Sequence, residues 1–284
     1  MKGILLSAAL LVVSNVYSGT TVIYGEDDRV DVYASQNSDF VEYAHSTAAM
    51  INRQRVTVNE DKSVFIGGSP LRAQGICRSE RFSHQVASGN CSGFLVGEDL
   101  LVTAGHCIQS MSDCRKYKWV FNFKVKDSTQ SRPDGVTADD VYSCKEIIER
   151  KLTRNSQDDY ALIRLDRKAK ATPLKFRTSG RVSRGDKLVV IGHPSGLPTK
   201  IADGASVRRP GSVFFTANLD TYGGNSGSAV INVKTGEVEG ILVRGEEDYQ
   251  RSPAGCLESY RVSNNGGRGE DVTNITNIRA LMEP

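Results

Sequence analysis

The segment LDTYGGNSGSAV, residues 219–230, contains the serine on which the interpretation of this chain depends. Ser226 follows the pair Gly223-Gly224 and is followed by Gly227. Segments rich in glycine and serine are usually loops, but glycine also adopts backbone conformations that are closed to other residues. A serine acts as a nucleophile only when a base lies within hydrogen-bond reach and an acid orients that base. The base and the acid must therefore be found elsewhere in the chain.

The chain has four histidines, and His106 has the most suitable context for a base. The stretch CSGFLVGEDLLVTAGHC places two apolar runs, residues 94–96 and 100–102, on either side of a Gly-Glu-Asp turn. This pattern predicts a β-hairpin. His106 comes where the second strand gives way to a loop, and a strand holds a side chain more rigidly than a free loop does. We expect the other histidines to be structural.

The stretch SQDDYALIRLDR offers the acid. Asp158 and Asp159 precede a strand-like apolar run, residues 160–165. We prefer Asp159, because an aspartate at the start of a strand can be buried beside the histidine. We expect Asp158 to be a solvated turn residue.

The N-terminus has the order of a secretory signal: Lys2, an apolar run over residues 4–13, and then small residues. Val16 and Ser18 fit the small-x-small rule for cleavage after Ser18, so we expect residues 1–18 to be a signal peptide. The apolar run is short for a membrane span, and the alternative of a membrane anchor is less favoured. The sequence predicts a secreted or periplasmic protein that is not membrane-bound once the signal is removed.

The six cysteines agree with export. An even number in an exported chain is typical of disulfides. Zinc binding is the alternative, but there is no CxxC pair and the histidines are not at ligand spacing, so we expect no metal and no cofactor. The cysteines are Cys77, Cys91, Cys107, Cys114, Cys144 and Cys256.

The composition is that of a globular protein, with 39% hydrophobic and 24% charged residues among 284. The net charge of +3 is small and no dense Lys/Arg run occurs, so we expect no nucleic-acid partner. The 27 glycines suit an all-β fold with many turns. Short strand-like runs recur between turn residues, which predicts an all-β barrel protein. These runs cover residues 92–96, 100–103, 119–123, 160–165, 187–191, 212–215, 229–233 and 239–243.

The three candidates, in the order His106, Asp159, Ser226, resemble the chymotrypsin-fold (trypsin-like) serine proteases. TAGHC is similar to the histidine motif of that family, DYAL to its aspartate motif and GGNSGSAV to its nucleophile motif. The resemblance implies two antiparallel six-stranded β-barrels with the active site in the cleft between them. We expect an extension over residues 19–76, the first barrel over 77–170, and the second barrel with a closing C-terminal helix over 171–284.

The resemblance implies a secreted serine endopeptidase that forms an acyl-enzyme with protein or peptide substrates, and we expect a monomer. Ser226 would be the nucleophile, His106 the base and Asp159 the residue that orients it. The backbone N–H groups of Gly224 and Ser226 would form the oxyanion hole. The resemblance also implies a Cys91–Cys107 disulfide, whereas the pairing of the other four cysteines stays open.

The bacterial glutamyl endopeptidases are the most similar branch. VIYGEDDRVDV, residues 22–32, looks like their mature N-terminus, and IGHPSGLPTKIA, residues 191–202, is similar to a strand and loop of these enzymes. We therefore expect a mature N-terminus near Val22. Asn225 stands where digestive relatives carry an aspartate that pairs with the new N-terminal amine, so we expect no activation through that ion pair.

Substrate preference is expected from residues around the serine. Asp220 lies six residues before Ser226, where trypsin-like enzymes carry the aspartate that selects Arg or Lys. With Thr221, Leu242 and Arg244 it would form the specificity pocket. Cleavage after Glu is the alternative, although Leu242 stands where glutamyl endopeptidases carry a histidine. An inactive protease-like binding protein and an esterase or lipase remain further alternatives.

Overall fold

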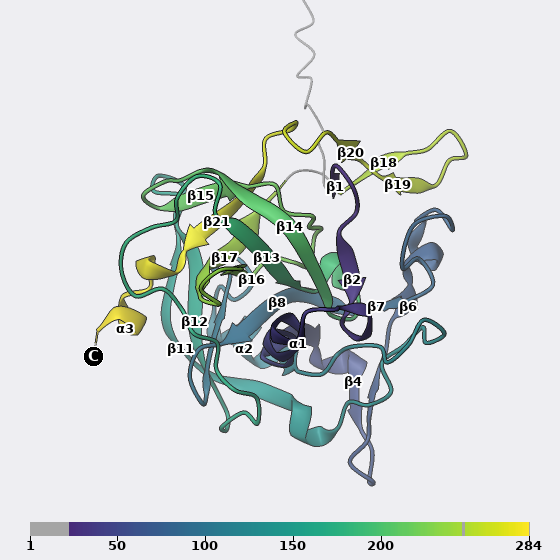
Figure 1. The fold of residues 1–284 in the computed structure, drawn as a ribbon. Coiled ribbons are helices and arrows are strands. Elements are labelled where there is room, and N and C mark those ends of the chain that lie inside the picture. Colours follow the sequence, from purple (N-terminus) through teal and green to yellow (C-terminus); the bar gives the residue numbers. More distant parts are fainter. Residues whose placement is uncertain (1–22, 246–247, 284) are drawn as a thin grey trace, which may run out of the picture.

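The structure, a computed structural model, describes residues 23–245 and 248–283. The expected signal peptide and Val22 lie outside these residues. Two β-barrels and a few short helices make up the described chain (Figure 1). The fold is all-β, as the sequence predicts, and each barrel is closed by six antiparallel strands.

The first barrel closes in the strand order β10-β11-β12-β9-β8-β3. Trp119 fills its interior and is fully buried. Gly93 makes room for this ring, because a Cβ at residue 93 would lie 2.7 Å from both Trp119 and Leu101. The strands are β3 (Thr47–Asn52), β8 (Gly89–Leu95), β9 (Leu100–Thr103), β10 (Tyr117–Val120), β11 (Val141–Leu152) and β12 (Asp159–Leu165).

The second barrel follows the order β13-β16-β17-β21-β15-β14 and closes by pairing β13 with β14. Strand β2 (Arg29–Asp31) adds to its edge beside β14. The core is aliphatic with one large ring, Phe215. The strands are β13 (Lys187–Gly192), β14 (Lys200–Arg209), β15 (Phe214–Ala217), β16 (Ala229–Asn232), β17 (Val238–Arg244) and β21 (Glu270–Asn274).

The structure corrects the boundary of the expected extension over residues 19–76. Strand β3 lies inside that range and forms one side of the first barrel, between β10 and β8. Its sequence, TAAMIN, is buried at five of six positions, so it lacks the alternation that identifies a half-exposed strand. Strand β2 also lies inside residues 19–76, and it belongs to the second barrel.

The C-terminal segment differs from the expected helix as well. It opens with strand β21, and only Arg279–Met282 form an α-helix, α3. All five residues of β21 are buried although two are carboxylates. The charged residues conceal the strand from a pattern based on hydrophobicity.

The remaining elements are short. The α-helices are α1 (Ser38–His45) and α2 (Met111–Lys116), and the 3₁₀ turns are η1 (Val32–Ala34), η2 (Arg53–Arg55), η3 (Leu71–Gln74), η4 (Ala138–Asp140), η5 (Pro194–Gly196) and η6 (Ile275–Asn277). The outlying strands are β1 (Ile23–Tyr24), β4 (Val56–Val58), β5 (Val64–Ile66), β6 (Ser69–Pro70), β7 (Val86–Ala87), β18 (Tyr249–Arg251), β19 (Leu257–Ser259) and β20 (Arg261–Val262).

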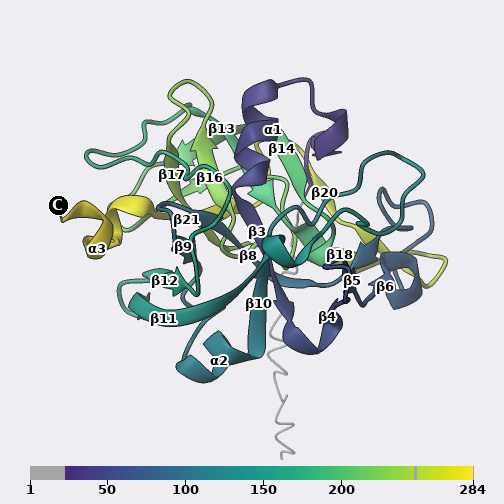
Figure 2. The ribbon, with the colours of Figure 1, turned by 90° about the horizontal axis from the view of Figure 1, so that it is seen from below.

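Each end of the described chain contacts the opposite half of the sequence. The N-terminal strand β1 pairs with β20, which belongs to the C-terminal half. The C-terminal helix α3 lies beside β11 of the first barrel, where Glu149 accepts hydrogen bonds from the backbone N–H groups of Arg279 and Ala280. Figures 1 and 2 show α3 at the side of the first barrel, and in Figure 1 it lies on the opposite side of the molecule from β1.

Three disulfides join the six cysteines. Cys91–Cys107 connects β8 to the segment after β9, and it is the pair that the resemblance implies. Cys114–Cys144 connects α2 to β11. Cys77–Cys256 connects the segment after η3 to the β18–β19 hairpin.

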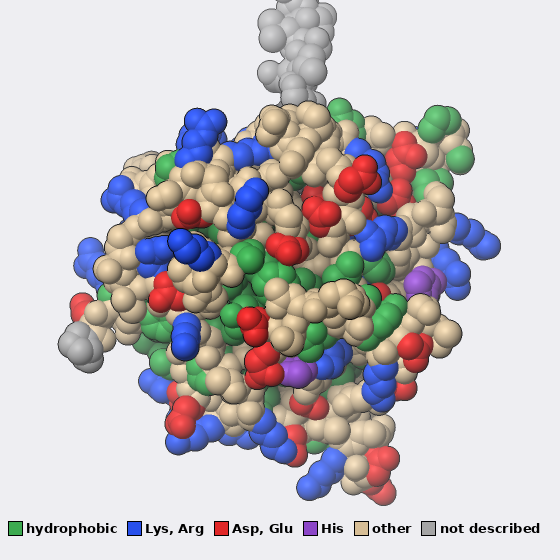
Figure 3. All heavy atoms as spheres, viewed as in Figure 1, with side chains coloured by type: hydrophobic (Ala, Val, Ile, Leu, Met, Phe, Trp, Pro, Cys, Tyr) green, Lys and Arg blue, Asp and Glu red, His purple; other side chains and the backbone are tan. Residues whose placement is uncertain are grey.

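Acidic and basic side chains are interspersed over the face drawn in Figure 3, so this face carries no extended field of one sign. Among the helices of the described residues, none is long and apolar enough to cross a membrane.

Candidate active site

His106, in the turn after β9, and Asp159, the first residue of β12, form a hydrogen-bonded pair. The Nδ1 atom of His106 lies 2.8 Å from Oδ2 of Asp159, and the backbone N–H of His106 donates to Oδ1 at 3.0 Å. Asp159 opens β12 and is 2% exposed, whereas about a third of the His106 side chain remains accessible. Both carboxylate oxygens are thus committed to one residue, which fixes the imidazole ring in position.

Gly105 allows the turn before His106 to pack closely against the neighbouring strands. A Cβ at this residue would lie 2.3 Å from the carbonyl oxygen of Lys151 and 2.7 Å from that of Tyr160. The Gly105 carbonyl in turn accepts a hydrogen bond from the Arg150 side chain at 2.8 Å. The turn therefore packs directly on the backbones of β11 and β12, and the histidine is set by strands on both sides.

Asp158 is not the solvated turn residue that the sequence suggests. It is 4% exposed, its carboxylate lies 2.6 Å from Lys151 Nζ, and it accepts a hydrogen bond from the Asn277 amide. The bond from Asn277 joins the first barrel to the C-terminal segment. Asp158 thus has a structural role, and its neighbour Asp159 alone contacts His106.

Ser226 lies beside the disulfide that flanks His106. Its carbonyl oxygen accepts the N–H of Ser92 at 2.8 Å, and the sulfur of Cys107 lies 3.7 Å away. Gly227 permits this approach, since its φ is 90° and a Cβ there would lie 2.0 Å from the Ser92 carbonyl. Among the described residues, no hydrogen bond joins Ser226 Oγ to His106, and such bonds often form only with substrate present.

Two backbone donors point away from every acceptor in the described part of the chain. The N–H groups of Gly224 and Ser226 donate to no described atom. Gly224 has a φ of 95°, and its own carbonyl accepts the Ser92 hydroxyl at 2.9 Å. Unpaired N–H groups at one loop are suited to bind an anionic oxygen.

A pocket of about 110 Å³ opens next to Ser226. Three of the four residues expected to form the specificity pocket line it, namely Thr221, Leu242 and Arg244. Its other lining residues are Tyr222, Gly223, Val243, Gly245, Asp248 and Glu270.

Asp220 does not line this pocket, which corrects the expectation that it forms the base. Its carboxylate accepts the backbone N–H of Tyr24 at 2.8 Å and that of Asp28 at 2.9 Å. Burial raises the pKa of Asp220 to about 7, although these two hydrogen bonds oppose the shift. Asp220 therefore anchors the N-terminal segment and does not face the pocket.

Glu270 is the buried acid that the sequence analysis missed. It is 2% exposed and accepts hydrogen bonds from the Thr221 hydroxyl at 2.8 Å and from the Tyr24 hydroxyl at 3.2 Å. Its carboxylate lies against the pocket wall, because a Cβ on Gly245 would be 1.8 Å from Oε2. Burial raises the pKa of Glu270 to about 8. Glu270 opens β21, whose charged residues hide the strand from a hydrophobic pattern, so no sequence signal identified it.

Arg244 contributes little positive charge to the pocket. Its guanidinium lies 3.4 Å from the Asp271 carboxylate and donates to the Gln157 carbonyl at 3.1 Å. The pocket lining also includes the carboxylates of Glu270 and Asp248.

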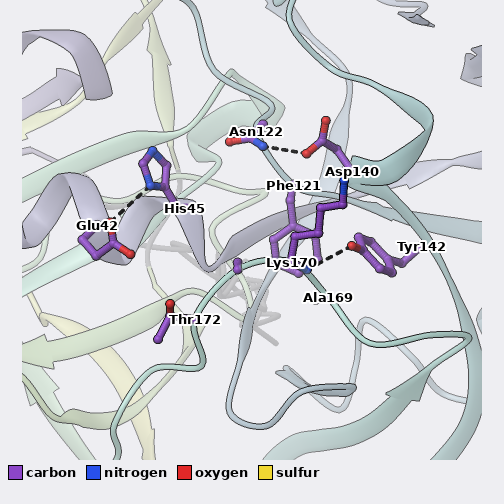
Figure 4. Close-up of a pocket in the computed structure, with 10 residues that line it drawn as sticks. Glu42, His45, Phe121, Asn122, Asp140, Tyr142, Ala169, Lys170 and Thr172 are labelled. Atoms are coloured by element: carbon purple, nitrogen blue, oxygen red, sulfur yellow. Dashed lines mark hydrogen bonds and ion pairs between the residues drawn. The ribbon is translucent and has the colours of Figure 1, made fainter. Parts of the chain in front are cut away.

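Two further groupings are separate from this chemistry. Cys91, His106 and Cys107 offer ligand-type atoms within 4.8 Å of one another, but sulfurs joined in a disulfide lack the thiolate that binds a metal. A second cavity of about 300 Å³ lies between α1 and residues 169–172, lined by residues such as His45 and Tyr142 (Figure 4). It contains none of the three catalytic candidates.

Comparisons with known proteins find relatives among peptidases. A family model described as "Trypsin-like peptidase domain" matches residues 91–241. A probable periplasmic serine protease do/HhoA-like from Haemophilus influenzae is 33% identical over 97 residues, which cover 31% of this chain and 21% of that protein. The chain thus spans about a fifth of the length of this relative.

Solved structures share the fold at low identity. A Glu endopeptidase in complex with MPD superposes with a TM-score of 0.55 at 16% identity, covering 92% of this chain and 97% of that one. The VesB protease of Vibrio cholerae gives a TM-score of 0.54 at 15% identity, covering 92% of this chain and 66% of that one.

Proposed function

Because the chain belongs to the trypsin-like peptidase domain family, we propose that it is an exported serine endopeptidase that acts through His106, Asp159 and Ser226. The observation that carries the proposal is the 2.8 Å contact between His106 and a buried Asp159, close to a serine that is flanked by two unpaired backbone donors. Export is supported by three disulfides, which persist in oxidising compartments.

The reaction follows from these contacts. Ser226 Oγ attacks the carbonyl carbon of the peptide bond, while Nε2 of His106 accepts the serine proton and passes it to the leaving amine. Asp159 accepts the Nδ1 proton, which keeps the ring in the required tautomer and stabilises the imidazolium. A water molecule then attacks the carbonyl carbon of the acyl-enzyme. His106 accepts the proton of this water and returns it to Ser226 Oγ as the acid product leaves.

The oxyanion is stabilised by backbone groups. The N–H groups of Gly224 and Ser226 are free to donate to it as the tetrahedral intermediate forms. Removing one such donor typically lowers kcat by about 10²–10³.

For substrate preference, we propose that Glu270, in place of Asp220, is the acid that binds a basic substrate side chain. A Lys or Arg side chain in the pocket would meet the Glu270 and Asp248 carboxylates, and the positive charge would favour the ionised form of Glu270. Cleavage after Lys and Arg is therefore the favoured specificity.

This assignment has a pH consequence. With a pKa of about 8, Glu270 is mostly protonated in the free enzyme at neutral pH. Binding a basic side chain then requires loss of a proton, so kcat/KM for such substrates should rise as pH increases through about 8. Glu270→Gln should abolish that part of the pH profile.

The enzymatic activity is tested by labelling the protein with a fluorophosphonate probe. We expect labelling of Ser226, its loss in Ser226→Ala, and no loss in Ser183→Ala, which changes an exposed serine of another loop. A folded protein that the probe does not label would support a protease-like binding protein instead.

The specificity is tested by digesting a mixed peptide library with the wild type, Glu270→Gln and Asp220→Asn. We expect cuts after Lys and Arg that fade in Glu270→Gln and persist in Asp220→Asn. Cuts mainly after Glu would favour the glutamyl alternative, in which a protonated Glu270 would donate a hydrogen bond to the substrate carboxylate.

A further inference from the structure

The geometry points to Ser195, Asp248 and Tyr249 as positioning residues that hold the Gly223–Gly224 peptide in the orientation required of an oxyanion donor. The inference rests on the proposed serine protease function. It assigns a role to three residues outside the motifs that the sequence displays, on two loops that are distant in the chain.

Gly223 is held on both sides of its backbone. Its N–H donates to Oδ2 of Asp248 at 2.6 Å, and its carbonyl accepts the N–H of Ser195 at 2.6 Å. Gly223 is exposed and glycine adopts many backbone conformations. Together with the turn that the Asn225 N–H closes on the Tyr222 carbonyl at 2.9 Å, these two bonds fix the orientation of the peptide between Gly223 and Gly224.

The orientation matters because of peptide geometry. In a planar trans peptide, the carbonyl of one residue and the N–H of the next point in opposite directions. When Ser195 holds the Gly223 carbonyl, the Gly224 N–H must point to the other side, where no described acceptor meets it. A flip of this peptide would turn the Gly224 donor away from the oxyanion.

Ser195 donates from an unusual conformation. Its φ of 53° is in the left-handed region, which a residue other than glycine rarely adopts. Its hydroxyl lies 2.6 Å from the Tyr249 hydroxyl, so a side-chain hydrogen bond helps to hold this conformation. The same turn is also held at Gly196, whose carbonyl accepts the N–H of Ser88 at 2.8 Å.

Tyr249 contacts both loops. Its ring packs on Tyr222, the residue before Gly223, with ring centroids 5.1 Å apart. Its hydroxyl stays neutral over the working pH range, since burial raises its pKa to about 12. The Tyr249 side chain therefore contacts both the loop that carries the nucleophile and the η5 turn that supports this loop.

The β18–β19 hairpin that carries Tyr249 is itself anchored. The Cys77–Cys256 disulfide and the bond from the Cys77 N–H to the Leu257 carbonyl, 2.8 Å long, join it to the segment after η3. Leu257 and Tyr249 also pack against a buried cluster that includes Leu197, which follows Ser195 in the same turn. The supporting residues thus form one continuous unit beside the pocket.

The test compares Tyr249→Phe and Ser195→Gly with wild-type enzyme. Tyr249→Phe keeps the ring on Tyr222 and loses only the hydroxyl, and Ser195→Gly accepts the positive φ but loses the hydroxyl. Tyr142→Phe is the matched control, because it removes a buried tyrosine hydroxyl that accepts the Lys170 N–H in the cavity of Figure 4.

A loosened donor weakens transition-state binding more than ground-state binding. We expect kcat to fall about tenfold in both variants, less than the 10²–10³ typical when a donor is lost outright, with KM changed less than about twofold. The inhibition constant of a peptide aldehyde, which forms a tetrahedral adduct, should rise by the same factor, whereas that of a product peptide should not. Asp248→Ala should lower kcat by a similar factor and also raise KM for basic substrates, because its carboxylate lines the pocket. Asp248→Asn keeps an oxygen acceptor for the Gly223 N–H and should recover most of kcat.

Unchanged kcat in Tyr249→Phe and Ser195→Gly, with both variants folded by their thermal transitions, would overturn the inference while leaving the proposed function intact. A rise in KM alone would also overturn it, because that result indicates a role in the pocket. A wild type that neither hydrolyses peptides nor reacts with a fluorophosphonate would overturn the proposed function and this inference with it.

Discussion

The two sides of the candidate active site are built differently. On one side, Asp159 lies at the start of β12 and His106 follows β9, and these strands pair directly in the first barrel. On the other side, Ser226 and Gly224 are placed by a loop. Glu270, at the start of β21, and Asp220 are held by contacts with a distant segment, the bonds from Tyr24.

The two sides of the site are therefore held by different kinds of contact. The acid and base depend on a local ladder of strands, so a change elsewhere should leave their geometry intact. The donors and the pocket depend on glycine conformations and on a network that joins residues far apart in sequence. Substitutions on the strand side should therefore affect chemistry alone, whereas those on the loop side should affect chemistry, specificity and stability in different proportions.

The largest expected effect is that of Asp159→Asn. The asparagine oxygen can still accept the His106 backbone N–H, but its amide would donate to Nδ1 and favour the wrong tautomer of the ring. A loss in kcat of about 10⁴ is expected by analogy with the known serine protease triad, with little change in thermal stability. Steady-state kinetics measure it, and Asp158→Asn, which changes the neighbouring buried carboxylate, should leave kcat within a few-fold of wild type. Comparable losses in both variants would contradict the assignment of Asp159.

Gly224→Ala should have the next largest effect. A Cβ at this residue would lie 2.6 Å from the His193 carbonyl and 2.7 Å from the Gly196 nitrogen, and the φ of 95° is strained for alanine. We expect kcat to fall by about 10²–10³, as for loss of one oxyanion donor. Gly185→Ala is the control, because Gly185 has a φ of 89° with no atom near its Cβ position. Equal activity losses in the two variants would indicate general strain and no specific role of the oxyanion loop.

The two disulfides outside the histidine loop should separate stability from activity. Replacing Cys77 and Cys256 together by alanine should lower kcat several-fold, because their bond anchors the hairpin that supports the oxyanion loop. Replacing Cys114 and Cys144 should lower the free energy of unfolding by about 2–5 kcal/mol and leave kcat unchanged in the folded fraction. Denaturant unfolding and active-site titration measure both quantities, and equal kcat values for the two double variants would argue against the anchoring role.

Asp220→Asn should have the smallest effect on activity. The asparagine oxygen can accept only one of the two backbone N–H groups well, and an unpaired buried N–H costs about 1–3 kcal/mol of stability. The folded pKa of about 7 exceeds the ordinary value of 3.8, so the protonated form contributes stability that is lost as pH rises from about 4 to about 7. The variant should show a smaller decline in stability over that range, with the ratio of cleavage after Arg and after Glu unchanged. A changed ratio would return Asp220 to the specificity pocket.

The sequence predicted the strand side better than the loop side. His106 follows and Asp159 precedes an apolar run whose pattern indicates a strand, and the structure brings the two residues into contact. Asp220 misled because its offset from the serine carries no information about Tyr24 and Asp28, which take up its carboxylate. Glu270 and Tyr249 were missed because their roles depend on segments more than 40 residues away or on strand pairing that a hydrophobic pattern does not encode.

For a related reason, the expected extension over residues 19–76 missed β3, and the expected C-terminal helix missed β21. Strand β3 is buried on both faces and gives no alternation, and β21 carries two buried carboxylates, so neither looks like a strand in isolation. Both are recognised only by the partners that they pair with, β8 and β10 for the first and β15 and β17 for the second.

The exchange of chain ends between the barrels has a consequence for unfolding. The chain passes from the second barrel to the first between β2 and β3, returns between β12 and β13, and crosses again to place α3 on β11. Neither barrel can detach without giving up the strand or helix that the other half supplies. The two barrels should therefore unfold as one cooperative unit. A single proteolytic cut between β12 and β13 should leave the two fragments associated, because β2 on the second barrel and α3 on the first still join them.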